Sequence, residues 1–119
     1  MMKILIVDDD TAILTVLERA LLKDHEITSV ETAVEGIEKV FESEPKFDVV
    51  ISDYEIGNEN GLEMLASIRE ISPATKLVLI TGSPGEFVGE KNNFLDGFLR
   101  KPFSIDELRG LITDLQGGK

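Results

Sequence analysis

The sequence of 119 residues contains no cysteine, only one histidine and no long apolar run. Without cysteine, neither disulfide frameworks nor thiolate metal sites are available, as is usual for a cytoplasmic protein. Because His25 is the only histidine, a histidine-based catalytic or metal cluster is excluded, and we expect this side chain on the surface. The apolar stretches are too short to cross a membrane, and no signal segment opens the chain. These absences predict a cytoplasmic protein without membrane association.

Basic residues are also scarce, with 12 Lys and Arg against 23 Asp and Glu and a net charge of -11. Nucleic-acid binding requires a basic patch, so this balance argues against it. Most of the glutamates are expected to be solvated, although the acidity also favours a divalent cation. The length predicts a single domain with one buried core, with residues 1–116 forming the domain and 117–119 a tail or the start of a linker.

Four short runs rich in Val, Ile and Leu end in polar residues suited to phosphate or metal chemistry. Runs of this kind, separated by helical patterns, are typical of buried strands in a parallel sheet. In such sheets, functional groups collect at the carboxyl ends of the strands. The runs are 3–7, followed by Asp8, Asp9 and Asp10; 47–52, followed by Asp53; 76–80, followed by Thr81; and 96–100, followed by Lys101 and Pro102.

Helical patterns alternate with these strands, and residues 25–30 add a more polar edge strand. We expect N-caps at Asp10 (or Thr11), Thr32, Asn60 and Ser104, a loop over residues 54–61, and a short or irregular helix within 86–92. The expected inward faces contain Ile13, Val16, Leu17, Ala20 and Leu21, then Val34, Ile37, Val40 and Phe41, then Leu62, Leu65 and Ile68, and finally Leu108, Leu111, Ile112 and Leu115.

This alternation predicts an α/β fold, a doubly wound five-stranded parallel sheet with helices on both faces. The most apolar strands should be central, which gives the strand order 2-1-3-4-5 and a crevice between strands one and three. Asp8, Asp9 and Asp53 should converge there. At ~4 Å and an effective dielectric near 20, each ionised pair would cost about 4 kcal/mol, so a cation or a proton must offset them.

A hard cation such as Mg²⁺ prefers oxygen ligands, and a carboxylate can attack phosphorus to form an aspartyl phosphate. The charge on the phosphoryl oxygens then needs a cation, an ammonium and a hydroxyl donor. Thr81 and Lys101, at the ends of neighbouring strands, supply the last two groups.

With these residues, the sequence resembles the receiver domains of two-component response regulators over essentially its whole length. The matching motifs are residues 4–10, Asp53 with Gly61 eight residues on, Thr81-Gly82 and Lys101-Pro102-Phe103. In combination and in this order they are highly specific.

The resemblance implies a role for each matching residue. Asp53 would accept a phosphoryl group from a histidine kinase or phosphotransfer protein. Asp8, Asp9, Asp53 and the backbone carbonyl of Glu55 would bind Mg²⁺ (or Mn²⁺). Thr81 and Lys101 would hold the phosphoryl oxygens, Phe98 would be the switch aromatic, and a cis peptide would precede Pro102. Glu55 and Ser83, from their position, would tune dephosphorylation.

Two features depart from the family pattern. The family usually has proline four residues after the acceptor, where this chain has Gly57, so the loop should be freer and the metal affinity different. The glycine-rich segment after Thr81 also puts the usual output surface in doubt. The partner downstream is an unknown protein or an output domain outside this chain, and we expect a monomer or a phosphorylation-dependent dimer.

Two other functions compete with the signalling hypothesis. An Asp-nucleophile phosphatase would carry Asp-x-Asp-x-Thr/Val, but Asp8 and Asp10 are followed by Ala12, and no inserted cap is present. An interaction domain that uses the fold without phosphorylation would not need the intact strand-end set. Nucleotide binding lacks both glycine-rich signatures. The expected function is therefore a signalling receiver rather than an enzyme.

Overall fold

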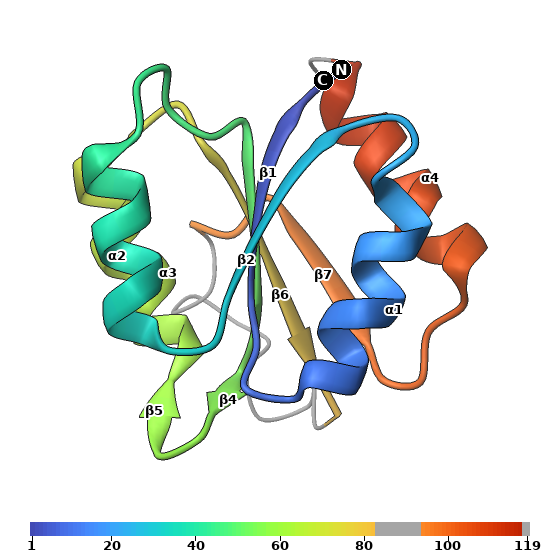
Figure 1. Cartoon of the computed structure of the whole chain (residues 1–119), viewed down its shortest axis with the longest axis horizontal. Coiled ribbons are helices and arrows are strands. Elements are labelled where there is room, and N and C mark those ends of the chain that lie inside the picture. Colours follow the sequence, from blue (N-terminus) through green and yellow to red (C-terminus); the bar gives the residue numbers. More distant parts are fainter. Residues whose placement is uncertain (83–93, 118–119) are drawn as a thin grey trace.

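The computed structural model describes residues 1–82 and 94–117, which form a five-stranded sheet with the order β2-β1-β3-β6-β7 (Figure 1). All neighbouring strands are parallel. The predicted order 2-1-3-4-5 is therefore confirmed. The strands are β1 (Lys3–Val7), β2 (Glu26–Val30), β3 (Val49–Asp53), β6 (Lys76–Thr81) and β7 (Gly97–Arg100), and the helices are α1 (Thr11–Leu21), α2 (Ala33–Glu42), α3 (Gly61–Ile71) and α4 (Ile105–Gln116).

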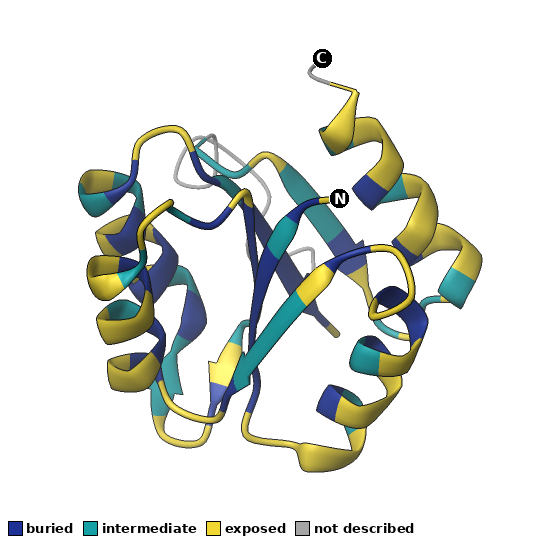
Figure 2. Ribbon diagram, turned by 45° about the horizontal axis from the view of Figure 1, so that its top comes forward, coloured by how far each residue is buried: buried dark blue, intermediate teal, exposed yellow. Residues whose placement is uncertain are grey.

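Helices cover both faces of the sheet, with α1 and α4 on one side and α2 and α3 on the other (Figure 1). Successive side chains of a strand point to opposite faces. Accordingly, Ile4 and Ile6 of β1 pack in the layer of α1 and α4. Leu5 and Val7 pack in the layer of α2 and α3. Both layers are buried against the sheet, while the outer sides of the helices are exposed (Figure 2).

The predicted inward face of α2 is wrong in part. Val34 and Phe41 are 58% and 71% exposed, whereas the small residues Ala33 and Gly36 are buried. A Cβ on Gly36 would lie 2.9 Å from the Met64 sulfur, so the helix approaches its neighbours through the side that has no bulk. The pattern of large apolar residues alone therefore predicted a face of α2 that is rotated away from the buried one.

The predicted face of α1 is also wrong in part, because Val16 is 49% exposed and Leu14, which was not expected on that face, is buried. The expectation of a surface histidine is also wrong, because His25 is only 8% exposed. Its Nδ1 accepts a hydrogen bond of 3.1 Å from the Met2 backbone N–H. A buried polar ring needs such a partner, and this one comes from a residue distant in the sequence.

The predicted N-caps are confirmed at Asp10, Thr32, Asn60 and Ser104. Ser104 forms the complete capping box with Glu107. At Thr32 only half of the box forms, because the Glu35 carboxylate accepts from the backbone N–H of Glu31. The expected helix within 86–92 and the residue Ser83 lie outside the described residues. No helix in the described part of the chain is long and apolar enough to span a bilayer.

Residues 54–61 were expected to be a loop, but they contain a small antiparallel hairpin. Its strands are β4 (Glu55–Ile56) and β5 (Glu59–Asn60), joined by Gly57 and Asn58. Gly57 has φ +61°, and no residue other than glycine has a positive φ in the described chain. Glycine at the first central position is typical of a type II′ turn. Proline, fixed near φ -65°, could not adopt this conformation.

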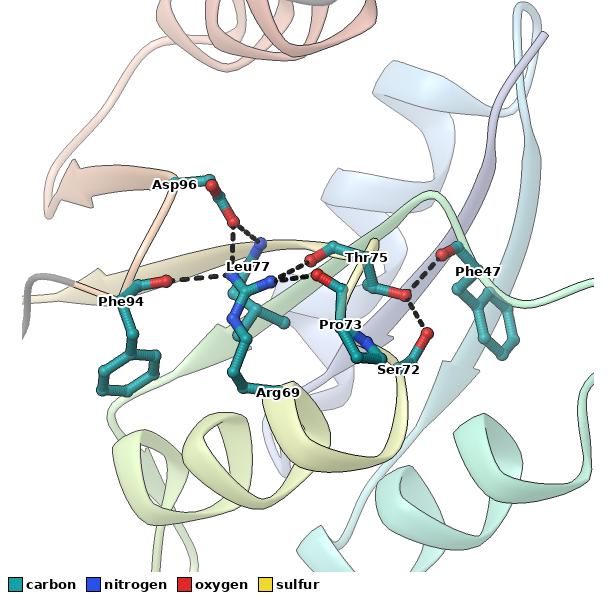
Figure 3. Close-up of polar contacts among 8 residues, drawn as sticks. All are labelled: Phe47, Arg69, Ser72, Pro73, Thr75, Leu77, Phe94 and Asp96. Atoms are coloured by element: carbon teal, nitrogen blue, oxygen red, sulfur yellow. Dashed lines mark hydrogen bonds and ion pairs between the residues drawn. The ribbon is translucent and has the colours of Figure 1, made fainter.

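The amino-terminal edge of the sheet is held by Arg69, at the end of α3 (Figure 3). Its guanidinium donates to the backbone carbonyls of Pro73, Thr75 and Phe94 and forms an ion pair of 2.7 Å with Asp96. The same Asp96 oxygen accepts from the Leu77 backbone N–H at 2.8 Å. One side chain thus joins the end of a helix to the starts of β6 and β7.

Asp96→Ala is expected to lower the free energy of unfolding by about 2 kcal/mol, because it leaves the Leu77 N–H and part of the Arg69 guanidinium without an acceptor. Urea denaturation would measure the change. The exposed Asp114 on α4 provides a control, since Asp114→Ala should change stability by less than about 0.5 kcal/mol. Equal effects of the two substitutions would contradict the role assigned to Asp96.

Candidate functional site

Each residue singled out at a strand end lies at the carboxyl edge of the parallel sheet. Asp8 follows β1, Asp53 ends β3, Thr81 ends β6 and Lys101 follows β7. The structure brings two of these side chains into direct contact, with Lys101 Nζ 2.9 Å from Asp53 Oδ2. Burial lowers the pKa of Lys101, but its hydrogen bond to Asp53 and the nearby carboxylates outweigh burial, and the net pKa is raised. The ammonium therefore stays charged beside the candidate acceptor.

Asp8 is the buried carboxylate of the set, with 1% of its surface exposed. Its Oδ1 accepts from the Asp10 backbone N–H at 2.9 Å. Its Oδ2, in the part of the chain that the structure describes, is buried without a hydrogen-bond partner. Burial raises the pKa of Asp8 to about 6, and the charges of Asp53 and Asp9 add to this effect against the opposing backbone hydrogen bond and Lys101. An unpartnered buried carboxylate oxygen is a position where a cation would be stabilised.

Asp9 is exposed. A Cβ built on Gly57 would be 4.0 Å from Asp9 Oδ2, so the turn that follows the acceptor closely approaches this carboxylate. Glu55, whose backbone carbonyl was expected to bind metal, is the first residue of β4 in the same hairpin. One expected ligand, the Glu55 carbonyl, therefore belongs to the hairpin whose turn approaches another expected ligand, Asp9.

Gly61 allows α3 to begin directly against the acceptor. A Cβ at this position would lie 1.9 Å from the Asp53 carbonyl oxygen and 2.7 Å from Ser52 Oγ. The Gly61 N–H also donates to the Tyr54 carbonyl at 2.6 Å. The motif spacing between Asp53 and Gly61 thus has a steric reason, because any other residue would displace the backbone of the acceptor.

Thr81 ends β6, whereas Phe98 lies within β7, before the end of that strand. Thr81 is 3% exposed, and its carbonyl accepts from the Lys101 backbone N–H at 2.9 Å. A Cβ on the next residue, Gly82, would meet no atom of the described residues within 4 Å. Phe98 pairs in register with Leu79 and is half-buried against the layer of α2 and α3. The peptide between Lys101 and Pro102 is cis.

The donor set fits a hard divalent cation. Carboxylate and carbonyl oxygens are the ligands that Mg²⁺ takes, usually with several waters. Over residues 1–82 and 94–117, no three Asp, Glu or His side chains form a ready-made metal cluster. The expected convergence of Asp8, Asp9 and Asp53 is therefore not present as a complete cluster, and their joint role as ligands stays a prediction. The unpartnered Asp8 Oδ2 is a carboxylate oxygen that the described side chains leave available to bind a cation.

Glu59, in the hairpin that follows Asp53, was not among the residues expected to support the site. Its carboxylate accepts a hydrogen bond of 2.9 Å from the Ala33 N–H, at the first residue of α2. The partners are separated by 26 positions, and Glu59 was expected in a solvated loop. Nothing in local periodicity signals such a contact.

Comparison with known proteins places this geometry in a family. The sequence profile described as "Response regulator receiver domain" matches residues 4–113. The chemotaxis protein CheY of Listeria monocytogenes is 32% identical over 111 residues, covering 91% of this chain and 92% of its own. The transcriptional regulatory protein GlrR of Escherichia coli is 31% identical over 93% of this chain. This chain spans only 25% of GlrR.

A solved structure gives the same result at the level of the fold. The response regulator TrrA of Thermotoga maritima, in complex with Mg²⁺ and BeF, superposes with a TM-score of 0.86 at 30% identity. The match covers 97% of this chain and 99% of that one. Together with the profile match and the strand-end motifs, these similarities mean that the chain belongs to the family of response regulator receiver domains.

Proposed function

We propose that this receiver takes a phosphoryl group onto Asp53 in a Mg²⁺-dependent reaction and switches its output surface in response. The observation that carries the proposal is the contact of 2.9 Å between Asp53 Oδ2 and Lys101 Nζ, beside the buried and unpartnered Asp8 oxygen. An acceptor, an ammonium and an open cation position are the parts that aspartyl phosphorylation needs. The complex of TrrA with Mg²⁺ and BeF supports the same chemistry in a relative.

In the proposed reaction, the donor is a phosphohistidine of a histidine kinase or phosphotransfer protein. An Asp53 carboxylate oxygen attacks phosphorus, the P–N bond breaks, and its electron pair leaves with the imidazole. Lys101 moves its hydrogen bond from the carboxylate to a phosphoryl oxygen, and the Thr81 hydroxyl donates to another. When bound by Asp8, Asp9, Asp53 and the Glu55 carbonyl, Mg²⁺ (or Mn²⁺) would neutralise charge on the phosphoryl oxygens.

The signal would leave the site through Thr81 and Phe98. A phosphoryl group adds about -1.5 to -2 charge, which biases the position of the threonine and, through it, the aromatic ring on β7. Glu55 and Ser83 are proposed to tune dephosphorylation by their position. The partner downstream would be a protein or output domain outside residues 1–116, with the domain in the cytoplasm as a monomer or phosphorylation-dependent dimer.

Intact mass spectrometry after incubation with acetyl phosphate and Mg²⁺ tests the proposal. The expected result is one added phosphoryl group, which is absent in Asp53→Asn and in the presence of EDTA. Rapid turnover of many phosphomonoesters would instead indicate a phosphatase. No adduct, together with no binding of beryllofluoride, would leave an interaction domain that does not use phosphorylation.

A further inference from the structure

The hairpin that follows Asp53 is tied to α2 by one side chain. Glu59 is half-buried, and its Oε1 accepts from the Ala33 N–H at 2.9 Å. Ala33 is the first residue of α2, and the first N–H groups of a helix lack partners inside the helix. A carboxylate there gains a charge-assisted hydrogen bond and a favourable interaction with the helix dipole. The contact therefore fixes β5 against α2.

A second contact joins the end of the same strand, β5, to the start of α3. The Asn60 side chain accepts from the Glu63 N–H at 3.1 Å and caps α3. Ile56 of β4 is 1% exposed in the layer of α2 and α3. The hairpin is thus held between the starts of two helices, and its turn lies against Asp9 through Gly57. These contacts set where the backbone of Glu55 lies.

We infer that Glu59 is a positioning residue for the cation site, because it holds the hairpin that carries the Glu55 carbonyl. The inference rests on the proposed function, which makes that carbonyl a ligand. Gly57 makes this contact important. Glycine lacks the proline ring that would restrict the turn, so the loop keeps more conformational freedom unless a side chain such as Glu59 restricts it. Glu59 pairs in register with Ile56, next to the expected ligand, so its release would loosen that ligand directly.

Three variants distinguish a positioning role of Glu59 from a general effect of its negative charge. Glu59→Ala removes both the acceptor and the charge, Glu59→Gln removes the charge but keeps an oxygen that can accept from Ala33, and Glu63→Ala removes a charge from the neighbouring helix start. The Mg²⁺ dissociation constant of each can be followed by tyrosine fluorescence. Tyr54 is the only tyrosine, tryptophan is absent, and Asn60 Nδ2 lies 3.4 Å from the Tyr54 hydroxyl.

Glu59→Ala is expected to weaken Mg²⁺ binding about tenfold, as is typical when a partner that orients a ligand is lost. Glu59→Gln and Glu63→Ala should remain within about threefold of the wild type on the same scale. Amide exchange provides a readout without metal: the Ala33 N–H should exchange faster in Glu59→Ala and near the wild-type rate in Glu59→Gln. A merely structural role would lower thermal stability in Glu59→Ala while leaving the dissociation constant unchanged.

Two results would overturn the inference alone. One is a Glu59→Ala protein that binds Mg²⁺ as the wild type does, and the other is an equal loss in all three variants, which would show a general effect of charge. A wild type that binds no Mg²⁺ would overturn the inference and the proposed cation site together. A wild type with the expected Glu59 dependence but no phosphoryl adduct would refute the proposed function alone.

Discussion

Gly61→Ala is expected to lower the free energy of unfolding by about 3 kcal/mol, the upper end of the usual cost of overpacking, because the added atom would meet rigid backbone. The added Cβ would lie 1.9 Å from the Asp53 carbonyl oxygen and 3.0 Å from its carbonyl carbon, which are backbone atoms of the central strand β3. No side-chain rotation can relieve such a contact, so either the start of α3 or the end of β3 must move. The change can be measured by urea denaturation.

The same substitution should impair phosphorylation, because displacing the Asp53 backbone moves its carboxylate away from Lys101. The matched control is Gly110→Ala in the exposed middle of α4, where an added Cβ meets no atom of residues 1–82 or 94–117 within 4 Å. That change should raise stability by about 0.5–1 kcal/mol, since alanine is the better helix residue. Gly61→Ala with wild-type stability would contradict the steric role assigned to this glycine.

Asp8→Asn is expected to stabilise the metal-free protein at pH 7 by about 2 kcal/mol. This is somewhat less than the free energy that corresponds to a shift of two pKa units. Burial raises the pKa of Asp8 from 3.8 to about 6, so the folded protein holds this proton more tightly than the unfolded chain does. Between these two values the folded state binds more protons, and stability contributed by this group therefore falls as the pH rises. The asparagine variant should lose this pH-dependent decrease.

The stabilisation should reverse when Mg²⁺ is added, because a cation bound to the folded state stabilises the wild type and finds one carboxylate fewer in Asp8→Asn. Thermal unfolding at pH 4 and pH 7, with and without Mg²⁺, measures both effects. Asp10→Asn is the control: Asp10 caps α1, asparagine caps equally well, and the pH dependence should persist. An Asp8→Asn protein that is less stable than the wild type at pH 7 would contradict the proposed cost of this buried charge.

The order of the sheet could be predicted because its signal is local and strong. The strands β1, β3 and β6 each contain an unbroken apolar run, which is the pattern expected of a parallel strand buried on both faces. The face of α2 could not be predicted as well, because it depends on what the helix packs against. Gly36 is buried only because Met64 and Val7 lie close to it, which no helical period encodes.

Some features of the candidate site could likewise be predicted from the sequence, and others could not. That Asp53 and Lys101 would lie at the same edge of the sheet followed from the parallel topology, but their contact of 2.9 Å did not. That one Asp8 oxygen would be buried without a partner, and that Glu59 would bind the start of α2, depend on packing between distant segments. The hairpin also escaped prediction, since its two strands are only two residues long.

The most direct test of the account is to locate the phosphoryl group. After reaction with acetyl phosphate and Mg²⁺, borohydride reduction converts a phosphorylated aspartate into homoserine, which peptide mass spectrometry identifies by position. The account predicts homoserine at Asp53, and none there when Mg²⁺ is withheld. Modification at Asp8, Asp9 or another carboxylate, or an Asp53 product formed equally well without a divalent cation, would contradict it.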